Sequence, residues 1–104
     1  MRLAIFADIH ANRQAFSACL DFARAHGAER IVCLGDIVGY GADPEWAVDT
    51  VMGLVDDGAV AVIGNHDHAI GTPSENMNAV AQAAIEWTRG RLSAAQRRFL
   101  SQLP

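Results

Sequence analysis

Three short apolar runs, each followed at once by a polar motif, constrain this chain more than any other feature. The runs occupy residues 3–7, 31–34 and 60–63. The motifs that follow them are Asp8-Ile9-His10, Gly35-Asp36-Ile37-Val38-Gly39 and Gly64-Asn65-His66-Asp67. Roughly thirty residues separate one motif from the next, which is the length of one strand-helix-strand unit. The sequence therefore predicts three parallel strands joined by two helices.

The three motifs are expected to meet at one edge of the sheet. The carboxyl ends of parallel strands share an edge, and such folds bind their ligands there. Asp36 would lie between the other two groups. In an extended segment residues two apart point the same way, so Asp8 and His10 can face one ion together. Carboxylates, imidazoles and amide oxygens are ligands for Mn, Fe, Ni or Zn, which makes a metal site the favoured hypothesis.

Each motif also has an ordinary explanation when it is taken alone. Asp8 could end a strand beside an exposed His10, and Asp36 after a glycine could simply form a turn. Asn65-His66-Asp67 could be a turn as well, because Asn and Asp tolerate left-handed backbone. The metal hypothesis is favoured because three separate loops would each need metal-binding residue types by chance.

Composition limits the class of protein. With 104 residues, of which 51% are hydrophobic, the chain is expected to form one domain over residues 1–104. The net charge of −4 argues against general nucleic-acid or anionic-membrane binding. The sequence has no lysine, which excludes a phosphate-loop GK[ST] motif and Schiff-base chemistry.

The same composition predicts a cytoplasmic protein. The first apolar run is too short for a secretory signal, and no run approaches membrane-spanning length. Cys19 and Cys33 are interpreted as buried thiols in a reducing compartment, on a helix and in a strand.

The expected element order is β-α-β-α-β-α-α, an α/β fold with a parallel sheet. Strands are predicted over 2–7, 30–34 and 59–63, the first apolar on both faces, and helices over 12–26, 43–56, 79–89 and from Ser93 onward, with a polar loop over 64–76. The helix boundaries rest on Asn12 and Asp43 as N-caps and on a capping box over 93–96. Each of the first three helices has side chains at helical spacing that are predicted to face the core. In chain order these are Phe16, Cys19, Leu20 and Ala23; Ala47, Val48, Val51, Met52 and Val55; and Val80, Ala81, Ala84, Ile85 and Thr88.

The motifs at 8–10, 35–41 and 64–67 closely resemble the first three motifs of the calcineurin-like metallophosphoesterases, in order and in spacing. The resemblance covers residues 1–67, and residues 84–89 resemble bacterial members too. It implies that the chain corresponds to the first half of the family's four-layer αββα sandwich. It also implies a phosphoesterase that hydrolyses phosphomonoesters or diesters with two divalent metal ions and a hydroxide that bridges them.

The resemblance implies a role for each motif residue. Asp8 and His10 would bind the first metal, Asp36 would bridge both metals, and Asn65 would bind the second through its amide oxygen. Two cations neutralise an anionic phosphate ester and acidify water into a nucleophile.

The remaining two motif residues would handle protons. His66 would protonate, or hydrogen-bond to, the leaving oxygen of the substrate, and Asp67 would orient His66.

The chain departs from the family in its histidines. Family members continue into a second sheet with three more metal-binding histidines, whereas this sequence has none after His68. The second metal site is therefore expected to be incomplete in this chain. His68 is interpreted as a solvated loop residue, with a substitute ligand as the lesser alternative.

Two consequences of this departure are left open by the sequence. A non-catalytic scaffold of the same fold, which binds a partner as the retromer subunit of this family does, is the alternative to a phosphoesterase. A missing second sheet would also leave one face of the strands bare, so self-association or a complementary chain is expected.

Two further features have competing interpretations. Tyr40 could line the mouth of the substrate site or simply pack the glycine-rich loop. The cluster of Arg89, Arg91, Arg97 and Arg98 is interpreted as a solvated helix face, with phosphate binding as the lesser alternative. The sequence does not name the substrate or the native metal.

Overall fold

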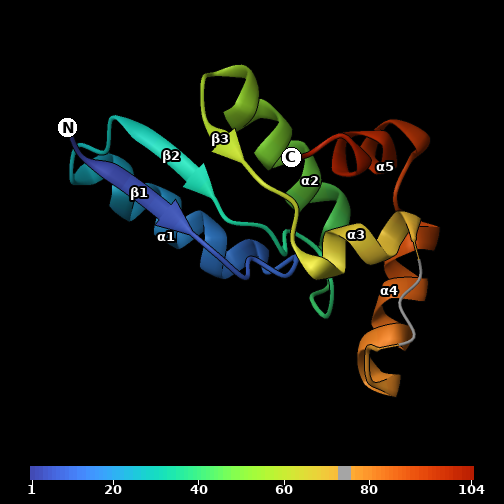
Figure 1. Ribbon diagram of the computed structural model, residues 1–104. Coiled ribbons are helices and arrows are strands. Elements are labelled where there is room, and N and C mark those ends of the chain that lie inside the picture. The colour runs from blue at the N-terminus through green and yellow to red at the C-terminus, as the bar shows by residue number, and fades with distance from the viewer. Residues whose placement is uncertain (73–75) are drawn as a thin grey trace.

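The computed structural model describes residues 1–72 and 76–104, which form three strands and five helices (Figure 1). The elements are β1 (Leu3–Phe6), α1 (Arg13–Ala25), β2 (Arg30–Cys33), α2 (Pro44–Asp56), β3 (Val60–Ala61), α3 (Asn65–Gly71), α4 (Ala79–Arg91) and α5 (Ala94–Ser101). The strands are parallel and lie in the order β1-β2-β3. The predicted α/β class is confirmed, with one helix more than expected.

The first two helices begin close to the predicted residues. Asn12 caps α1, and its side-chain oxygen accepts a hydrogen bond of 3.1 Å from the Ala15 N–H. Asp43 occupies the N-cap position of α2, but its side chain makes no capping hydrogen bond to any described residue. The prediction of an Asp43 cap is wrong in that respect. Pro44, whose ring fixes a helical φ, is the residue that begins the helix.

Helices α1 and α2 cover the same face of the sheet. Cys33 and Ala61 belong to one buried cluster with Phe16 of α1 and Val48 of α2. Phe6, which pairs with Cys33, also packs edge-on against the ring of Phe16. The core of the molecule therefore begins between the strands and these two helices, and it continues to Ile70 of α3, Ile85 of α4 and Leu100 of α5.

The other face of the sheet is open. Ile5, Val32 and Val60 form a row across the three strands through the pairing register. Ile5 is 60% exposed, Leu3 is 52% exposed and Val60 is 45% exposed. We call Leu3, Ile5, Val32 and Val60 the open face. The prediction that the first strand is buried on both sides is wrong, because no described helix covers this side of the strands.

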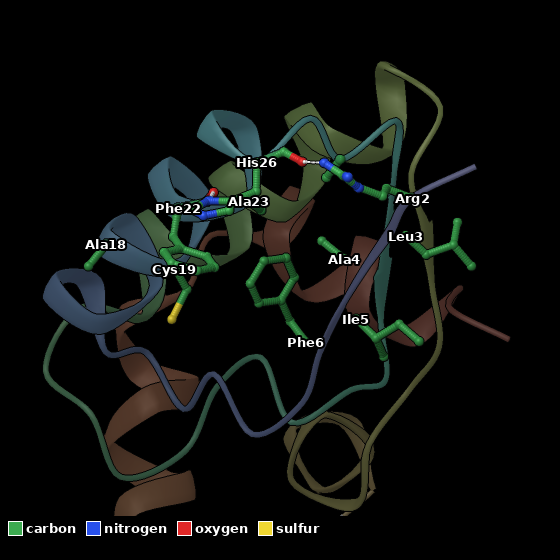
Figure 2. A pocket seen from close by; sticks show the side chains of 11 residues that line it. Arg2, Leu3, Ala4, Ile5, Phe6, Ala18, Cys19, Phe22, Ala23 and His26 are labelled. Carbon is green, nitrogen blue, oxygen red and sulfur yellow. Dashed lines mark hydrogen bonds between the residues drawn. The ribbon is translucent and has the colours of Figure 1, made fainter.

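The sheet ends at β1, and a groove separates that strand from α1 (Figure 2). The groove has a volume of about 600 Å³. Ala4 and Phe6 point from β1 toward α1, whereas Leu3 and Ile5 point away from it. Cys19 lines the groove and is exposed, so the prediction of a buried Cys19 is wrong. It lies on the part of α1 that faces the groove beside the edge strand.

The predicted polar loop over 64–76 begins instead with helix α3. The Asp67 side chain accepts a hydrogen bond of 3.0 Å from the Gly64 N–H, which stabilises the first turn. A carboxylate in the first turn also complements the helix dipole. Residues 73–75 of the predicted loop lie outside the described residues.

The predicted cap of α5 is present, but one of the residues predicted to face the core from α4 does not. The capping box of α5 is confirmed: the Gln96 N–H donates to Ser93 Oγ at 3.1 Å, and the Ser93 N–H donates to Gln96 Oε1 at 2.8 Å. Val80 is 71% exposed, so its predicted inward position is wrong. Ile85 and Thr88 of α4 are buried because this helix packs against α3 and α2.

The arginine cluster near the carboxyl end is partly structural. The Arg89 guanidinium donates hydrogen bonds of 2.7 and 2.8 Å to the carbonyls of Ile70 and Ala69, the last turn of α3. Arg91 forms an ion pair of 3.1 Å with Glu45 at the start of α2. The interpretation as a solvated face is therefore wrong for Arg89, which satisfies helix carbonyls. Within the described ranges, no helix is long and apolar enough to cross a membrane.

Candidate metal centre

The first two polar loops run side by side beyond the ends of their strands. The Asp8 N–H donates to the Gly35 carbonyl at 3.3 Å, and the His10 N–H donates to the Asp36 carbonyl at 2.9 Å. The pairing continues as the Ala11 N–H donates to the next carbonyl of the second loop at 2.8 Å. These bonds hold Asp8, His10 and Asp36 at one edge of the sheet, as the sequence predicted.

The backbone of these loops is strained. In the described part of the chain, every non-glycine residue with positive φ lies in the loops after β1 and β2. They are Asp8 (φ 55°), His10 (47°), Ala11 (55°), Asp36 (55°) and Tyr40 (63°). The left-handed conformation costs an L-residue roughly 1–2 kcal/mol. Strain of this kind persists where the surrounding structure imposes it, and it clusters at functional sites.

Glycines let the three loops approach one another closely. A Cβ on Gly64 would overlap the backbone nitrogen and the carboxylate of Asp36. A Cβ on Gly39 would overlap the ring of His66, and its φ of +97° disfavours any side chain as well. The third loop can therefore lie directly against the second only because both positions lack a side chain.

The side chains of the three loops converge on one point. His10, Asp36 and His66 each offer a ligand atom, and these atoms lie within 4.8 Å of one another. His10 Nε2 is 3.9 Å from Asp8 Oδ1 and 4.0 Å from Asp36 Oδ2. Two imidazoles and two carboxylates at this separation match the donor set of a first-row divalent metal.

A backbone carbonyl orients the His10 ring. His10 Nδ1 lies 2.9 Å from the Val38 carbonyl oxygen. A carbonyl can only accept, so Nδ1 carries the hydrogen and the neutral ring has its lone pair on Nε2, the nitrogen that faces Asp8 and Asp36. Metal-binding histidines are commonly held by such a hydrogen bond. Val38 could not be predicted as a partner of His10, because the group that it contributes is part of the backbone.

Asn65 lies directly on Asp36. The terminal atom of its amide is 3.0 Å from Asp36 Oδ2 and 3.1 Å from Asp36 Oδ1. With its nitrogen toward Asp36 the amide donates hydrogen bonds to the carboxylate. With its oxygen toward Asp36, three oxygens face one another, which a cation between them would stabilise. Asp36 also accepts a hydrogen bond of 2.9 Å from the His66 N–H.

His66 is nearly buried, with 7% of its surface exposed. Its Nδ1 has no hydrogen-bond partner among the described residues. Burial lowers the pKa of His66, and the Asp36 carboxylate acts in the opposite direction. In its neutral form the ring can donate one hydrogen bond and accept another.

Asp67 does not contact His66 by a hydrogen bond, contrary to the expectation that it orients the ring. Its carboxylate instead accepts three backbone hydrogen bonds: Oδ1 from Ile37 at 2.9 Å and Val38 at 3.2 Å, and Oδ2 from Gly64 at 3.0 Å. Burial raises the pKa of Asp67 to about 6, although the backbone donors lower it. Asp67 thus joins the second loop to the third.

Two other candidate residues are separated by the structure. The His68 side chain is exposed and lines a different cavity, beside Arg97, and it is outside the group of converging ligand atoms. The Tyr40 ring lies over the site, with its centroid 5.2 Å from that of His10 and 4.9 Å from that of His66. Of the two interpretations of Tyr40, its position at the mouth of the site is the one that the structure supports.

Comparisons with known proteins agree with this geometry. The sequence matches the calcineurin-like phosphoesterase family over residues 1–99. It is 38% identical to an uncharacterised protein of Methanocaldococcus jannaschii, over 98% of this chain and 42% of that protein.

Two solved structures resemble the fold. A metallophosphoesterase from Sphaerobacter thermophilus superposes with a TM-score of 0.80 and 42% identity, over 100% of this chain and 42% of that one. A protein described as a candidate diadenosine tetraphosphatase gives a TM-score of 0.72 and 29% identity, over 99% of this chain and 43% of that one. The chain thus spans less than half the length of these relatives. It belongs to the calcineurin-like phosphoesterase family.

Proposed function

We propose that this chain provides the metal-binding loops of a metal-dependent phosphoesterase that hydrolyses phosphomonoesters or diesters. The observation that carries the proposal is the convergence of polar side-chain atoms from His10, Asp36 and His66 within 4.8 Å, two of them proposed metal ligands and the third the group that would act on the leaving oxygen. Asp8 and Asn65 stand next to this group. A polar cluster on a strained backbone would be costly to maintain in a chain that did not use it.

The residues fit a pair of divalent ions. Asp8 and His10 are proposed to hold the first ion, Asp36 to contact both and Asn65 to hold the second. When bound, such ions (Mn, Fe, Ni or Zn) neutralise the charge of a phosphate ester and acidify water. Asp36 suits the shared position because His10 and Asn65 both lie next to its carboxylate.

His66 is proposed to act on the leaving group. Its ring lies beside the His10 ring, with 4.8 Å between centroids, and it is oriented by packing against Gly39. A neutral imidazole can donate a hydrogen bond to the leaving oxygen, and the imidazolium form can protonate it. Asp67 is proposed to support this role by holding the loops on either side of His66, rather than by contacting its ring.

The completeness of the site depends on more than these loops. The chain spans 42% of the length of the Sphaerobacter thermophilus enzyme, and the family resemblance expects further histidine ligands in a second sheet. The activity of the whole protein is therefore part of the proposal. One relative is described as a candidate diadenosine tetraphosphatase, so bis-nucleoside polyphosphates belong among the substrates to be tested.

The direct test is hydrolysis by the Mn²⁺-loaded protein of p-nitrophenyl phosphate and of bis(p-nitrophenyl) phosphate. We expect turnover that is lost in Asp36→Asn, which keeps the shape of the side chain but removes its charge. Asp21→Asn is the matched control, because Asp21 is an exposed acid on α1, away from the site. Absence of turnover, with Asp36→Asn the same as the wild type, would contradict catalysis by this chain.

A partner on the open face is proposed as well. Ile5 and Val60 expose apolar side chains in a row across the sheet. Contiguous exposed apolar surface usually marks a contact site. We propose that self-association or a complementary chain covers it, which light scattering tests directly. A stable monomer that binds no hydrophobic dye would contradict the proposal.

A cytoplasmic location is proposed on the state of the thiols. Cys19 and Cys33 are both free cysteines. Exposed unpaired thiols such as Cys19 are most easily kept in a reducing compartment. Fractionation of cells that express the protein provides the test.

A further inference from the structure

A second cavity opens beside the candidate metal centre. It has a volume of about 510 Å³ and lies between the loops that follow β1 and β2. Asp8 and His10 form one part of its lining, and Tyr40 and Asp43 form another. The volume is typical of a pocket for a small organic ligand. A phosphate held at the metal centre would therefore have its organic group next to this cavity.

Tyr40 forms a wall between the cavity and the candidate catalytic ring. Its ring touches both His10 and His66, yet 52% of the residue remains exposed. Its φ of 63° lies in a region that glycine occupies without strain, and its neighbours on both sides are glycines. A large aromatic side chain is thus retained, on a strained backbone, at the one place where it faces an incoming ligand.

The charge of the cavity restricts what it can hold. Asp8 and His10, on the side of the metal centre, are the proposed metal ligands; the rest of the lining includes the carboxylate of Asp43 and the side chains of Asn12 and Gln14, and neither arginine nor lysine. Asp43 makes no capping hydrogen bond within the described part of α2, so its carboxylate is available to the cavity. A leaving group with its own negative charge would face the Asp43 carboxylate with no arginine or lysine to pair with it, whereas an uncharged ring with hydrogen-bond donors would meet acceptors and apolar groups there.

We infer that Tyr40 selects phosphate esters whose organic part is an uncharged aromatic ring, which it holds by ring stacking in this cavity. The inference rests on the proposed phosphoesterase function and specifies its substrate class. Aromatic pairs prefer offset-stacked or edge-to-face geometry, and a half-exposed ring such as Tyr40 can offer either. Tyr40 is a specificity-determining residue in this account and takes no part in bond breaking.

The test compares two non-hydrolysable ligands by calorimetry on the Zn²⁺-loaded protein. Phenylphosphonate should bind about three- to tenfold more tightly than methylphosphonate, which is the range expected for one added aromatic contact. Carboxyphenylphosphonate, whose ring carries an extra negative charge, should lose that advantage. The chain has one tyrosine, so its ring signals in the NMR spectrum should shift with phenylphosphonate and not with methylphosphonate.

Three variants assign the preference to the ring. Tyr40→Gly removes the ring and relieves the positive φ, so it should fold and bind both ligands equally. Tyr40→Phe should keep the preference. Phe22→Ala removes an exposed ring from the groove beside β1 and should leave the preference for phenylphosphonate unchanged.

The outcomes separate the two proposals. Equal binding of both phosphonates by the wild type, or a preference that survives in Tyr40→Gly, would overturn the role of Tyr40 and leave the phosphoesterase proposal standing. Failure of both ligands to bind would overturn both.

Discussion

The same three strands end in two regions of opposite character. At their carboxyl ends, the loops are polar, closely packed and strained, and their side chains converge within a few ångströms. On the open face, the side chains are apolar, extended and exposed. One region gathers polar atoms that can bind a cation, and the other presents an apolar surface that no described helix covers.

The difference teaches which region this chain can build by itself. The polar edge is held by bonds within the chain, such as those from three backbone amides to Asp67. The open face has no such internal support, since the side of Ile5 away from α1 meets no described helix. The arrangement of these loops should therefore be a property of the chain alone, and the covering of the open face a property of its assembly.

The largest expected effect is on the close approach of the loops. Gly64→Ala places a methyl group into Asp36, which must move, so the free energy of unfolding should fall by about 3 kcal/mol and divalent ion binding should weaken. Urea unfolding and calorimetry measure the two effects. Gly53→Ala is the matched control: it lies inside α2 with no described atom within 4 Å of the added group, and it should stabilise by about 0.5–1 kcal/mol. Equal effects of the two variants would contradict the packing argument.

Asp67→Asn should have the next largest effect. The new amide nitrogen would face a backbone N–H donor and leave it unpaired, which costs about 2 kcal/mol. Zinc affinity should also fall about tenfold, because supporting residues tune metal sites by this order. Asp49→Asn provides the comparison: its partner, Gln96 Nε2 at 3.0 Å, can donate to an amide oxygen equally well. An unchanged unfolding midpoint in Asp67→Asn would show that the loops do not depend on this residue.

Substitution on the open face should change association and leave stability nearly unchanged. Ile5→Thr keeps a β-branched residue in β1 but reduces the apolar row, and exposed substitutions usually alter stability by less than about 0.5 kcal/mol. Light scattering should give a smaller mass for this variant, and hydrophobic dye binding should fall. Zinc affinity should not change, which separates the two regions. A mass identical to that of the wild type would place the contact elsewhere.

The smallest effect on stability is expected from labelling a thiol in the groove. Cys19 is exposed, whereas Cys33 is buried and burial raises its pKa to about 11. At pH 8 an alkylating reagent should therefore modify one thiol of the folded chain, with no shift in the unfolding midpoint, and two thiols in urea. Mass spectrometry identifies the modified residue.

The same pKa shift sets a direction for the dependence of stability on pH. The unfolded chain loses the Cys33 proton near its ordinary pKa of 9.0, before the folded chain does. The contribution of this thiol to stability is therefore complete below about pH 9 and is lost as the pH rises toward 11. In the labelling experiment, alkylation of both thiols of the folded chain at pH 8 without denaturant would contradict the buried position of Cys33.

Local patterns in the sequence predicted most of this fold. Asn12, Pro44 and the Ser93 capping box predict where three of the helices begin, because each acts within a few residues of its own position. The regular spacing of the polar motifs predicted which loops meet. The helix-start signals are local, and the spacing of the motifs follows from the length of one strand-helix-strand unit, so neither requires knowledge of tertiary contacts.

The parts that could not be predicted depend on contacts between distant segments. Helix α3 depends on Asp67, whose carboxylate also binds residues of the second loop. The exposure of Cys19 and Val80 depends on where the sheet and the neighbouring helices end. The Val38 carbonyl that orients His10 has no side-chain signature at all.

The hydrogen bond from His10 to Val38 also bears on how the site acquires its ion. The ring is already fixed in the tautomer and rotamer that presents Nε2 to the two acids, so capture requires no conformational search by this side chain. Because the ring is ordered before the metal binds, the entropy cost of ordering it does not reduce the affinity for the metal. The metal-free and metal-bound forms should therefore differ little in the conformation of this loop, which makes His10 a preorganised ligand.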